Sequence, residues 1–406
     1  MITATSASIS ATPARKLRIA VLNRTFSPTG GGAERYSMAL VEQLAAKHEI
    51  HVFAQEIDHH WPGVSYHRIS APLRKPRWIN QLWFATATWW ATRRGFDVVH
   101  SHENTWHGDV QTVHVLPVKY NLFQGRAGWR LMLRWIKVVS SPRLLTYLLL
   151  ERHRYAPRPG RQLVVTSESL RAIMAQTYPG SGGKLSVITP GITLPPSITP
   201  ERKRAAKVFL GLPVEGICLL FVANDYRKKG LHTLLDALAQ LPADIILAVV
   251  GNAGQISLFR EQVTALKLEQ RVFFLGPLKE VGPAYEATDC LVHPTLEDTF
   301  AMVVLEAMAH GLPVVVSGAK YCGISGLLTE GVNALILDDP RDAPALADSL
   351  LDVLNQTAQT AQLARGAIDF AMHYQWRELA LKQEALYFKV LAGKILSDAH
   401  IGPAQP

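Results

Sequence analysis

The sequence predicts an α/β protein of two doubly wound parallel-sheet domains that face a central cleft. Short runs rich in Val, Ile and Leu alternate with helical segments, which is typical of parallel sheets covered on both faces. A proline-rich seam at 189–204 interrupts this pattern near the middle of the chain. The 406 residues are enough for two domains, each with a core of its own.

Each half of the chain contains six segments that favour strands. In the first half they are residues 17–23, 48–55, 97–102, 110–115, 162–168 and 185–191. In the second half they are residues 218–224, 244–252, 271–276, 290–295, 313–318 and 333–338. We therefore place one Rossmann-like domain at 16–192 and the other at 200–372. The helical stretch 376–396 follows the last strand, and we expect it to pack back on the first domain.

The composition is that of a globular protein, with 48% hydrophobic and 18% charged residues. Residues 1–15 are rich in Ser, Thr and Ala and lack the apolar centre of a secretion signal, so we expect a disordered leader. No uninterrupted apolar run reaches the ~18 residues that a membrane span needs. The three cysteines show neither disulfide nor metal-ligand spacing, which favours a reducing compartment.

The formal net charge of +9 is concentrated between residues 116 and 162, where ten basic side chains accompany one acid, Glu151. Such a field attracts nucleic acid, acidic lipid or phosphorylated glycan. Within it, Arg130, Arg134 and Lys137 fall on one face of a predicted helix. Apolar side chains gather on another face: Trp129, Met132, Leu133 and Ile136. This pattern predicts a helix that binds an anionic membrane surface, and the alternative is a solvated basic face over a core helix.

Two loops after predicted strands have the chemistry to hold a phosphate. Gly30, Gly31 and Gly32 open a helix, where bare backbone and the helix N-terminus favour an anion, although an ordinary tight turn is the alternative. Residues 227–229, Arg-Lys-Lys, follow a strand that should end at the cleft. Cations there can clamp a diphosphate and stabilise a leaving group, whereas a solvated loop is the alternative.

The segment "HPTLEDTFAMVVLEAMAHGLPVVVSG" (293–318) keeps three acids, Glu297, Asp298 and Glu306, in an apolar setting. We interpret it as a strand followed by a helix with Asp298 and Thr299 at its N-cap. At about 100° per residue, Glu306 then lies about 80° from Asp298 and about 180° from Glu297. Asp298 and Glu306 are therefore the predicted working pair, and Glu297 is expected to face water.

A glutamate inside this apolar helix needs a hydrogen-bond donor, and the ribose hydroxyls of a nucleotide are suitable donors for Glu306. The backbone N–H groups of Phe300, Ala301 and Met302 are expected to point from the helix start toward a phosphate or hydroxyl. The alternative is that Asp298 is a simple cap and that Glu306 bonds a backbone group.

The same segment resembles the signature of the family 4 retaining glycosyltransferases of the GT-B fold. That signature is an acid, seven intervening residues, and a Glu followed by Ala-Met-Ala-x-Gly-x-Pro-Val. The resemblance spans nearly the whole chain and includes the Gly-rich loop, "RKKG", "VVGNAG" (249–254) and the C-terminal helix. It implies that the N-terminal domain binds the acceptor and the C-terminal domain binds a nucleotide sugar.

The resemblance also implies roles for single residues. Glu306 matches the glutamate that holds the ribose, Asp298 the acid at the donor sugar, and Lys229 the diphosphate lysine. Gly31 and Gly32 match the phosphate-facing loop. His114 falls where many members have a histidine beside the donor sugar. The surroundings of the sugar-phosphate match Phe300, Ala301, Met302 and Val303.

Two departures from the family pattern concern charge and reach. Asp298 is one methylene shorter than the usual Glu. Asn224 stands where many members have Arg, and Arg227 or Lys228 could supply that charge.

The resemblance implies a retaining transfer in which the departing diphosphate oxygen deprotonates the acceptor hydroxyl. No Asp-x-Asp motif occurs, so we expect no catalytic metal and no cofactor other than the nucleotide-sugar co-substrate. His114 is interpreted as a group that orients the sugar, the alternative being a core histidine. We interpret His100, His102 and His107 as cleft lining rather than a metal site.

Within the family, "NDYRKKG", "KYCGIS" and residues 147–170 look most like the lipopolysaccharide core glucosyltransferases of type I. That likeness implies glucose transfer from UDP-glucose to a glycolipid acceptor, by a cytoplasmic enzyme peripheral to the inner face of the cytoplasmic membrane. A mannosyl-, galactosyl- or heptosyltransferase on the same scaffold, or an inactive relative, are alternatives. A nucleic-acid partner is not expected, because the chain has no recognition motif of that class.

Overall fold

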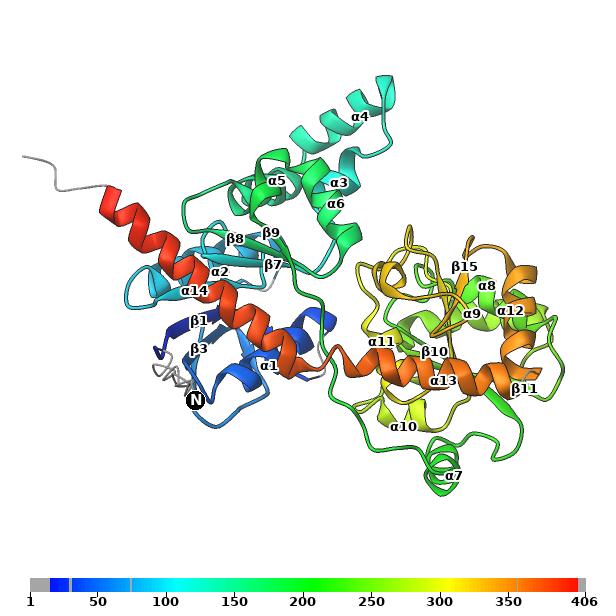
Figure 1. The fold of residues 1–406 in the computed structure, drawn as a ribbon. Coiled ribbons are helices and arrows are strands. Elements are labelled where there is room, and N and C mark those ends of the chain that lie inside the picture. Colours follow the sequence, from blue (N-terminus) through cyan, green and yellow to red (C-terminus); the bar gives the residue numbers. More distant parts are fainter. Residues whose placement is uncertain (1–14, 29–30, 74, 356, 401–406) are drawn as a thin grey trace, which may run out of the picture.

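The computed structural model describes residues 15–28, 31–73, 75–355 and 357–400. Two domains lie side by side, each built on a parallel sheet with helices on both faces, so the predicted fold class is confirmed (Figure 1). Apart from Arg15, the expected leader lies outside the described residues, as does Gly30.

The N-terminal sheet has seven parallel strands in the order β5-β3-β1-β6-β7-β8-β9. Their bounds are β1 (Arg18–Leu22), β3 (Glu49–Ala54), β5 (Val64–Arg68), β6 (Val98–Ser101), β7 (Val110–Val113), β8 (Gln162–Val165) and β9 (Leu185–Val187). A two-stranded sheet beside it consists of β2 (Thr25–Phe26) and β4 (Glu56–Ile57). The order of the first six strands along the chain is that of a Rossmann sheet.

The C-terminal sheet has six parallel strands in the order β12-β11-β10-β13-β14-β15, which is the same winding. Their bounds are β10 (Ile217–Ala223), β11 (Ile245–Gly251), β12 (Val272–Gly276), β13 (Cys290–His293), β14 (Val314–Ser317) and β15 (Leu335–Leu337). Both sheets place the ends of their first and fourth strands at the point where the winding reverses. Ligands of open α/β sheets bind at such a point.

Helices connect the strands of both sheets. Those of the N-terminal domain are α1 (Gly32–Leu44), α2 (Arg77–Thr92), α3 (Val118–Phe123), α4 (Gly128–Val139), α5 (Pro142–Tyr155), α6 (Glu168–Thr177) and the 3-10 turn η1 (Pro179–Lys184). Those of the C-terminal domain are α7 (Pro200–Phe209), α8 (Leu231–Leu238), α9 (Ile256–Ala265), α10 (Gly282–Glu286), α11 (Met302–Ala309), α12 (Ala343–Asn355) and α13 (Thr357–Met372), with 3-10 turns η2 (Ala253–Gln255) and η3 (Gly323–Leu327).

Alternate residues of the C-terminal strands supply two separate cores. Leu220 and Val222 of β10 face the core that contains α11, whereas Leu219 and Phe221 face the core of α8 and α12. Successive side chains of a strand point to opposite faces, so a strand buried on both faces is apolar throughout. This explains why the continuous Val/Ile/Leu runs mark these strands in the sequence.

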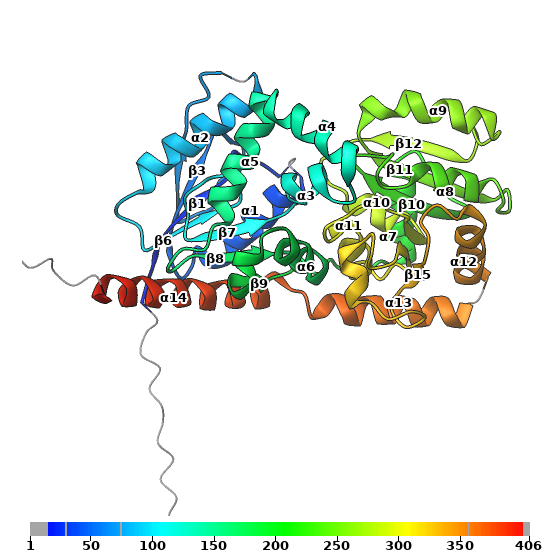
Figure 2. The same ribbon diagram turned by 90° about the horizontal axis from the view of Figure 1, so that it is seen from above.

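The last helix, α14 (Trp376–His400), leaves the C-terminal domain and lies along the N-terminal one (Figures 1 and 2). Trp376, Leu379 and Tyr387 share a core with β1, β3 and α1. The two chain crossings between the domains touch, because Ile192 exchanges backbone hydrogen bonds with Tyr374 and Trp376. The two chain segments that cross between the domains therefore lie next to each other. The α14 helix follows the C-terminal domain in sequence and packs on the N-terminal domain.

All twelve predicted strands are present, each shortened by zero to four residues. The sequence prediction missed β2, β4 and β5. The β5 strand lies at the sheet edge, and its residues Val64–Arg68 are mostly exposed, so no apolar run marks it. Among the helices in the described part of the chain, none contains an apolar stretch of membrane-spanning length.

Candidate active site at the domain junction

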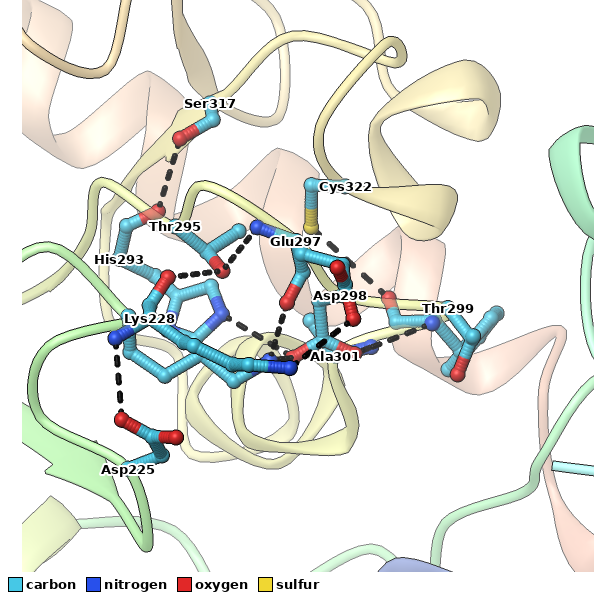
Figure 3. Close-up of polar contacts among 12 residues, drawn as sticks. Asp225, Lys228, His293, Thr295, Glu297, Asp298, Thr299, Ala301, Ser317 and Cys322 are labelled. Carbon is cyan, nitrogen blue, oxygen red and sulfur yellow. Dashed lines mark hydrogen bonds and ion pairs between the residues drawn. The ribbon is translucent and has the colours of Figure 1, made fainter. Parts of the chain in front are cut away.

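Two loops of the C-terminal domain meet at the carboxyl ends of β10 and β13 (Figure 3). Lys228 O accepts the backbone N–H of Leu296 at 2.8 Å. Gly230 makes this approach possible, since its φ is +82° and a Cβ there would lie 2.0 Å from Pro294 O. Only glycine fits that position. The "RKKG" segment is thus fixed against the loop that carries Glu297 and Asp298.

Asp298 is at the centre of this junction. One oxygen, Oδ1, accepts the backbone N–H groups of Phe300 and Ala301 at 3.2 and 2.8 Å. The other, Oδ2, accepts the Lys229 ammonium at 2.6 Å and faces His293 Nε2 at 3.4 Å. Burial by itself raises the pKa of Asp298, but the His293 hydrogen bond and the Lys229 charge outweigh burial, and the net pKa is well below its usual range. Asp298 is therefore a carboxylate at any pH near neutrality.

The start of the following helix differs from the prediction. The α11 helix begins at Met302 with Ala301 as its N-cap, so the placement of Asp298 and Thr299 at the N-cap is wrong, as is the angle derived from it. The N–H groups of Phe300 and Ala301 donate to Asp298 rather than pointing to a ligand, which corrects that prediction as well. Ala301 has φ +72° and ψ +71°, a left-handed conformation that costs a non-glycine residue roughly 1–2 kcal/mol.

Glu306 faces the opposite domain. Its Oε1 accepts Arg35 Nη1 of α1 at 3.0 Å, and its Oε2 accepts the Tyr285 hydroxyl of α10 at 2.7 Å. Burial and the Glu306 charge raise the pKa of Tyr285 far above its usual value, so that hydroxyl remains a donor. The alternative that Glu306 bonds only a backbone group is wrong. Its place at the junction is compatible with the predicted ribose role.

Sequence reasoning missed three side chains of this site: Arg35, Tyr285 and His293. Arg35 lies one turn into the helix that follows the Gly-rich loop, and His293 is the last residue of β13. Both positions lie close to the carboxyl ends of strands, and this signal could have identified them. No local pattern marks Tyr285, because its contact with Glu306 joins two helices that only the fold brings together.

The N-terminal domain contributes His114, which follows β7. The Thr299 hydroxyl donates to His114 O at 2.8 Å, which joins the two domains beside Asp298. The His114 ring lies 3.0 Å from His102 Nδ1 through Nε2 and packs edge-on against Tyr36. Burial and the nearby Arg154 lower the pKa of His114 to about 3. A neutral imidazole can orient a sugar by hydrogen bonding but supplies no positive charge.

The neighbouring histidines His100, His102 and His107 are all buried, so the interpretation of these residues as cleft lining is wrong. His100 bonds Tyr387 and Thr112 at 2.7 Å each, and its ring lies 4.2 Å from that of His102. Burial lowers the pKa of His100 to about 3 and shifts the pKa of His102 in the same direction. Within the described residues, no group of three or more His, Cys, Asp or Glu side chains is placed to hold a metal ion.

The remaining predicted donor residues lie around this junction with different surroundings. Gly32 approaches Met302 across the domain boundary, and Met302 packs on the cores of both domains. Glu297 is exposed, so the prediction that it faces water is confirmed. Its Oε1 lies 3.3 Å from the ammonium of Lys228, which is also exposed. The remaining three predicted positions show ordinary environments: Gly31 precedes α1, Arg227 is exposed, and Val303 packs partly buried on the α11 side of the sheet.

The amphipathic helix α4 projects from the N-terminal domain (Figure 1). Buried Val138 holds it to the domain, while Arg130 and Lys137 are exposed and Arg134 is half-buried. At least half of the surface of each apolar side chain on the outer arc is exposed: Trp129, Met132, Leu133, Trp135, Ile136 and Val139. The alternative of a core helix with a solvated basic face is thus wrong for this arc.

The sequence matches two family models that together span most of the chain. The family described as Glycosyltransferase Family 4 matches residues 30–194, and that described as Glycosyl transferases group 1 matches residues 203–370. The chain belongs to the family 4 glycosyltransferases. The boundary between the two matches coincides with the linker between β9 and α7.

Among curated relatives are D-inositol 3-phosphate glycosyltransferases. The one from Corynebacterium urealyticum is 30% identical over 55% of this chain and 56% of its own length. The one from Xylanimonas cellulosilytica is 28% identical over 72% of each chain. The match thus spans little more than half the length of the first of these relatives.

Solved structures of the same fold cover nearly all of this family 4 chain. WaaG, a glycosyltransferase involved in lipopolysaccharide biosynthesis, has a TM-score of 0.77 at 19% identity and covers 90% of this chain and 98% of its own. Anabaena Alr3699/HepE in complex with UDP-glucose has a TM-score of 0.71 at 20% identity, with 94% and 100% covered. At this identity the likeness shows the GT-B fold.

Proposed function

We propose that the protein is a retaining glycosyltransferase that moves a hexose, glucose from UDP-glucose in the first instance, to a membrane-associated glycolipid such as the lipopolysaccharide core. The observation that carries the proposal is Glu306, a largely buried carboxylate at the domain junction whose Oε1 is held by a guanidinium of the other domain. A carboxylate so placed can exchange Arg35 for the two hydroxyls of a ribose. The likeness in fold to Alr3699/HepE in complex with UDP-glucose supports the choice of donor, and the likeness to WaaG, involved in lipopolysaccharide biosynthesis, supports the choice of acceptor.

The diphosphate is met by Lys229 and Lys228 at the end of β10. Lys229 lies against Asp298, and the incoming diphosphate competes with that carboxylate for the ammonium. As the bond between the anomeric carbon and the phosphate oxygen breaks, negative charge grows on the leaving group, where these cations stabilise it. The acceptor oxygen forms the new bond on the same face, and its proton moves to the departing phosphate oxygen.

The protein then acts by positioning. Asp298 is the acceptor for a donor-sugar hydroxyl, and His114 of the other domain lies close to it because its backbone carbonyl accepts the Thr299 hydroxyl. The chain lacks an Asp-x-Asp motif, and two lysines lie where the diphosphate is proposed to bind, so we propose that transfer needs no divalent metal.

The acceptor side of the proposal rests on α4. Exposed Trp and aliphatic side chains beside exposed basic ones suit a helix lying in the interface of an anionic bilayer. We propose that α4 holds the enzyme at the cytoplasmic face of the membrane and brings a lipid-borne acceptor to the N-terminal domain.

The decisive experiment is a panel of UDP-, GDP- and ADP-sugars, each tested for binding by calorimetry and for slow hydrolysis with and without EDTA. Glucose release from UDP-glucose with EDTA present is the expected result. Hydrolysis of GDP-mannose, UDP-galactose or a nucleotide-heptose instead selects the corresponding alternative. Failure of every nucleotide sugar to bind the wild-type chain excludes the proposed function.

A second candidate follows from the curated relatives. Because they are named D-inositol 3-phosphate glycosyltransferases, a small phosphorylated cyclitol is an alternative acceptor. Transfer to free D-inositol 3-phosphate without any lipid selects this candidate over the glycolipid.

A further inference from the structure

The N-terminal domain has a polar cavity of about 800 Å³ at the edge of its sheet where β1, β3 and β5 end. Its volume is within the range of ligand sites in proteins. None of the residues that line it belongs to the donor site described above. Three of them are arginines from three different elements: Arg24 after β1, Arg68 at the end of β5, and Arg77 at the start of α2.

Two of these arginines are not neutralised. Arg68 and Arg77 are exposed, and neither guanidinium has an ion-pair partner within the described residues. Arg24 is held by Glu103, whose carboxylate accepts Arg24 Nε and the Arg24 backbone N–H, each at 3.1 Å. That pair fixes the direction of the Arg24 side chain through Nε.

The N-terminus of α2 adds to the positive potential. Its N-cap is Pro76, and no side chain caps the first turn of this 16-residue helix. Uncapped N–H groups at the start of a long helix favour an anion. A rigid wall completes the cavity, because the Gln55 and Asn80 amides exchange hydrogen bonds at 2.8 and 2.9 Å, and Gln55 also donates to Ser70 O.

The position of the cavity relates it to the reaction. His114 follows β7, and β1 lies two strands from β7 while β5 lies four strands away. At about 4.8 Å per strand, Arg24 is about 10 Å and Arg68 about 19 Å along the edge from the point where His114 and Thr299 meet. A group bound between them is too far away to be on the reacting sugar ring.

We infer that this cavity recognises an oxyanion, a phosphate or a sugar carboxylate, carried by the acceptor glycan on a different residue from the one that receives the sugar. This inference rests on the proposed function for the word acceptor. Paired arginine forks are suited to planar or tetrahedral oxyanions. The neutral wall of amides, Gln55 and Asn80, offers hydrogen bonds to the hydroxyls of the same residue.

One acid opposes the anion. Glu56 also lines the cavity and is exposed. An anion can therefore bind only if Glu56 stays in contact with water. Removing the Glu56 charge should strengthen anion binding, whereas removing an arginine charge should weaken it.

The test uses calorimetry of the full-length chain saturated with UDP, at low ionic strength. The probes are glucose 6-phosphate, glucuronate, inorganic phosphate and glucose. We expect the two anionic sugars to bind and glucose to bind far more weakly, with the stronger of the two naming the oxyanion. The double variant Arg68→Gln/Arg77→Gln should weaken that binding about tenfold or more. Glu56→Gln should strengthen it.

Arg94→Gln is the matched control, an exposed arginine past the far end of α2, about 25 Å from Arg77 along the helix axis. It should leave anion binding unchanged. Equal binding of glucose and glucose 6-phosphate, or unchanged affinity in a folded double variant, overturns the inference. Inorganic phosphate binding as tightly as glucose 6-phosphate also overturns it, since the cavity then does not recognise a sugar. UDP affinity measured on the same samples separates these outcomes from failure of the donor site.

Discussion

The charged side chains at the carboxyl ends of the strands differ between the two domains in whether they form ion pairs. In the C-terminal domain the site charges are paired: Lys229 with Asp298, Lys228 with Glu297, and Glu306 with Arg35. At the N-terminal edge, Arg68 and Arg77 line a cavity and make no ion pair within the described residues, although Glu56 lines the same cavity. Under the proposed function, a donor exchanges into existing ion pairs, whereas an anionic acceptor meets two arginines that are not ion-paired.

The largest effect is expected for a substitution of Glu306, one of the paired charges. Glu306→Gln removes the charge that two ribose hydroxyls need, and we expect UDP to bind more than about 100-fold more weakly, at about 1.5–3 kcal/mol per charged hydrogen bond. Calorimetry with UDP measures this. Glu269→Gln, which changes an exposed carboxylate of the same domain away from the site, is the control. Unchanged UDP affinity in Glu306→Gln excludes the ribose role.

Asp298→Asn tests the central pair. The amide keeps an acceptor for the N–H groups of Phe300 and Ala301 but loses the charge that holds Lys229, so the lysine and the sugar are misplaced. We expect turnover to fall about 100-fold, with a much smaller change in UDP affinity. Steady-state kinetics with the donor identified by the panel separate kcat from binding. Equal turnover leaves Asp298 with only its local structural contacts.

The same variant has a pH signature. The pKa of Asp298 is lower in the folded chain than its ordinary value of 3.8, so its contribution to stability is present above that value and is lost as pH falls below it. Thermal unfolding should be measured between pH 3 and neutrality. The difference in stability between the wild type and Asp298→Asn should be smaller at pH 3 than at neutral pH. Parallel curves contradict a lowered pKa.

The unpaired charge of the N-terminal domain extends to α4. Replacing Arg130, Arg134 and Lys137 by Gln should weaken binding to anionic vesicles by about 100-fold or more, since each of the three cations contributes about 1 kcal/mol near such a surface. Co-sedimentation with vesicles of acidic and of neutral lipid measures this. The control removes three exposed charges of the other domain: Arg260, Lys279 and Arg365. Undiminished binding of the α4 variant refutes the interfacial role.

Arg35→Met sharpens the idea that the donor exchanges into a pair. Arg35 Nε is buried without a hydrogen-bond partner in the described residues, so the pair with Glu306 is incompletely satisfied. Removing the guanidinium frees Glu306 for ribose, and we expect UDP to bind about two- to fivefold more tightly, since a partly exposed pair is worth about 1 kcal/mol or less. Weaker binding means that Arg35 itself contacts the nucleotide.

The smallest effect concerns Ala301. Ala301→Gly relieves a left-handed conformation but adds freedom to the unfolded chain, and we expect a net gain of about 0.5 kcal/mol in unfolding free energy. Ala307→Gly, in the middle of α11, is the control and should lose about 1 kcal/mol. Urea unfolding of both variants decides the sign. A loss in both places shows that the Ala301 methyl packs more favourably than its backbone is strained.

Much of the donor half could be read from the chain because its signals are local. Strands buried on both faces are mostly apolar, so the twelve predicted strands are visible as runs, although β7 also buries Gln111 and Thr112. The spacing of Asp298 and Glu306 belongs to one continuous segment. The error at the start of α11 arose because Asp298 and Thr299 also suit an N-cap. The contact with Lys229, 69 residues away, instead holds Asp298 outside the helix.

The sequence by itself determined two Rossmann-like domains, the candidate donor residues and the amphipathic character of α4. Tertiary structure alone decided that Arg35 and Tyr285 are the partners of Glu306 and that Arg24, Arg68 and Arg77 line one cavity. The reason is that helical and strand periodicities act over a few residues, whereas the partner of a buried charge is chosen by which chain segments the sheet order brings together. An exposed edge strand such as β5 has no apolar periodicity, so the sequence gives no sign that Arg68 lines a cavity. Only the fold shows which residues lie beside it.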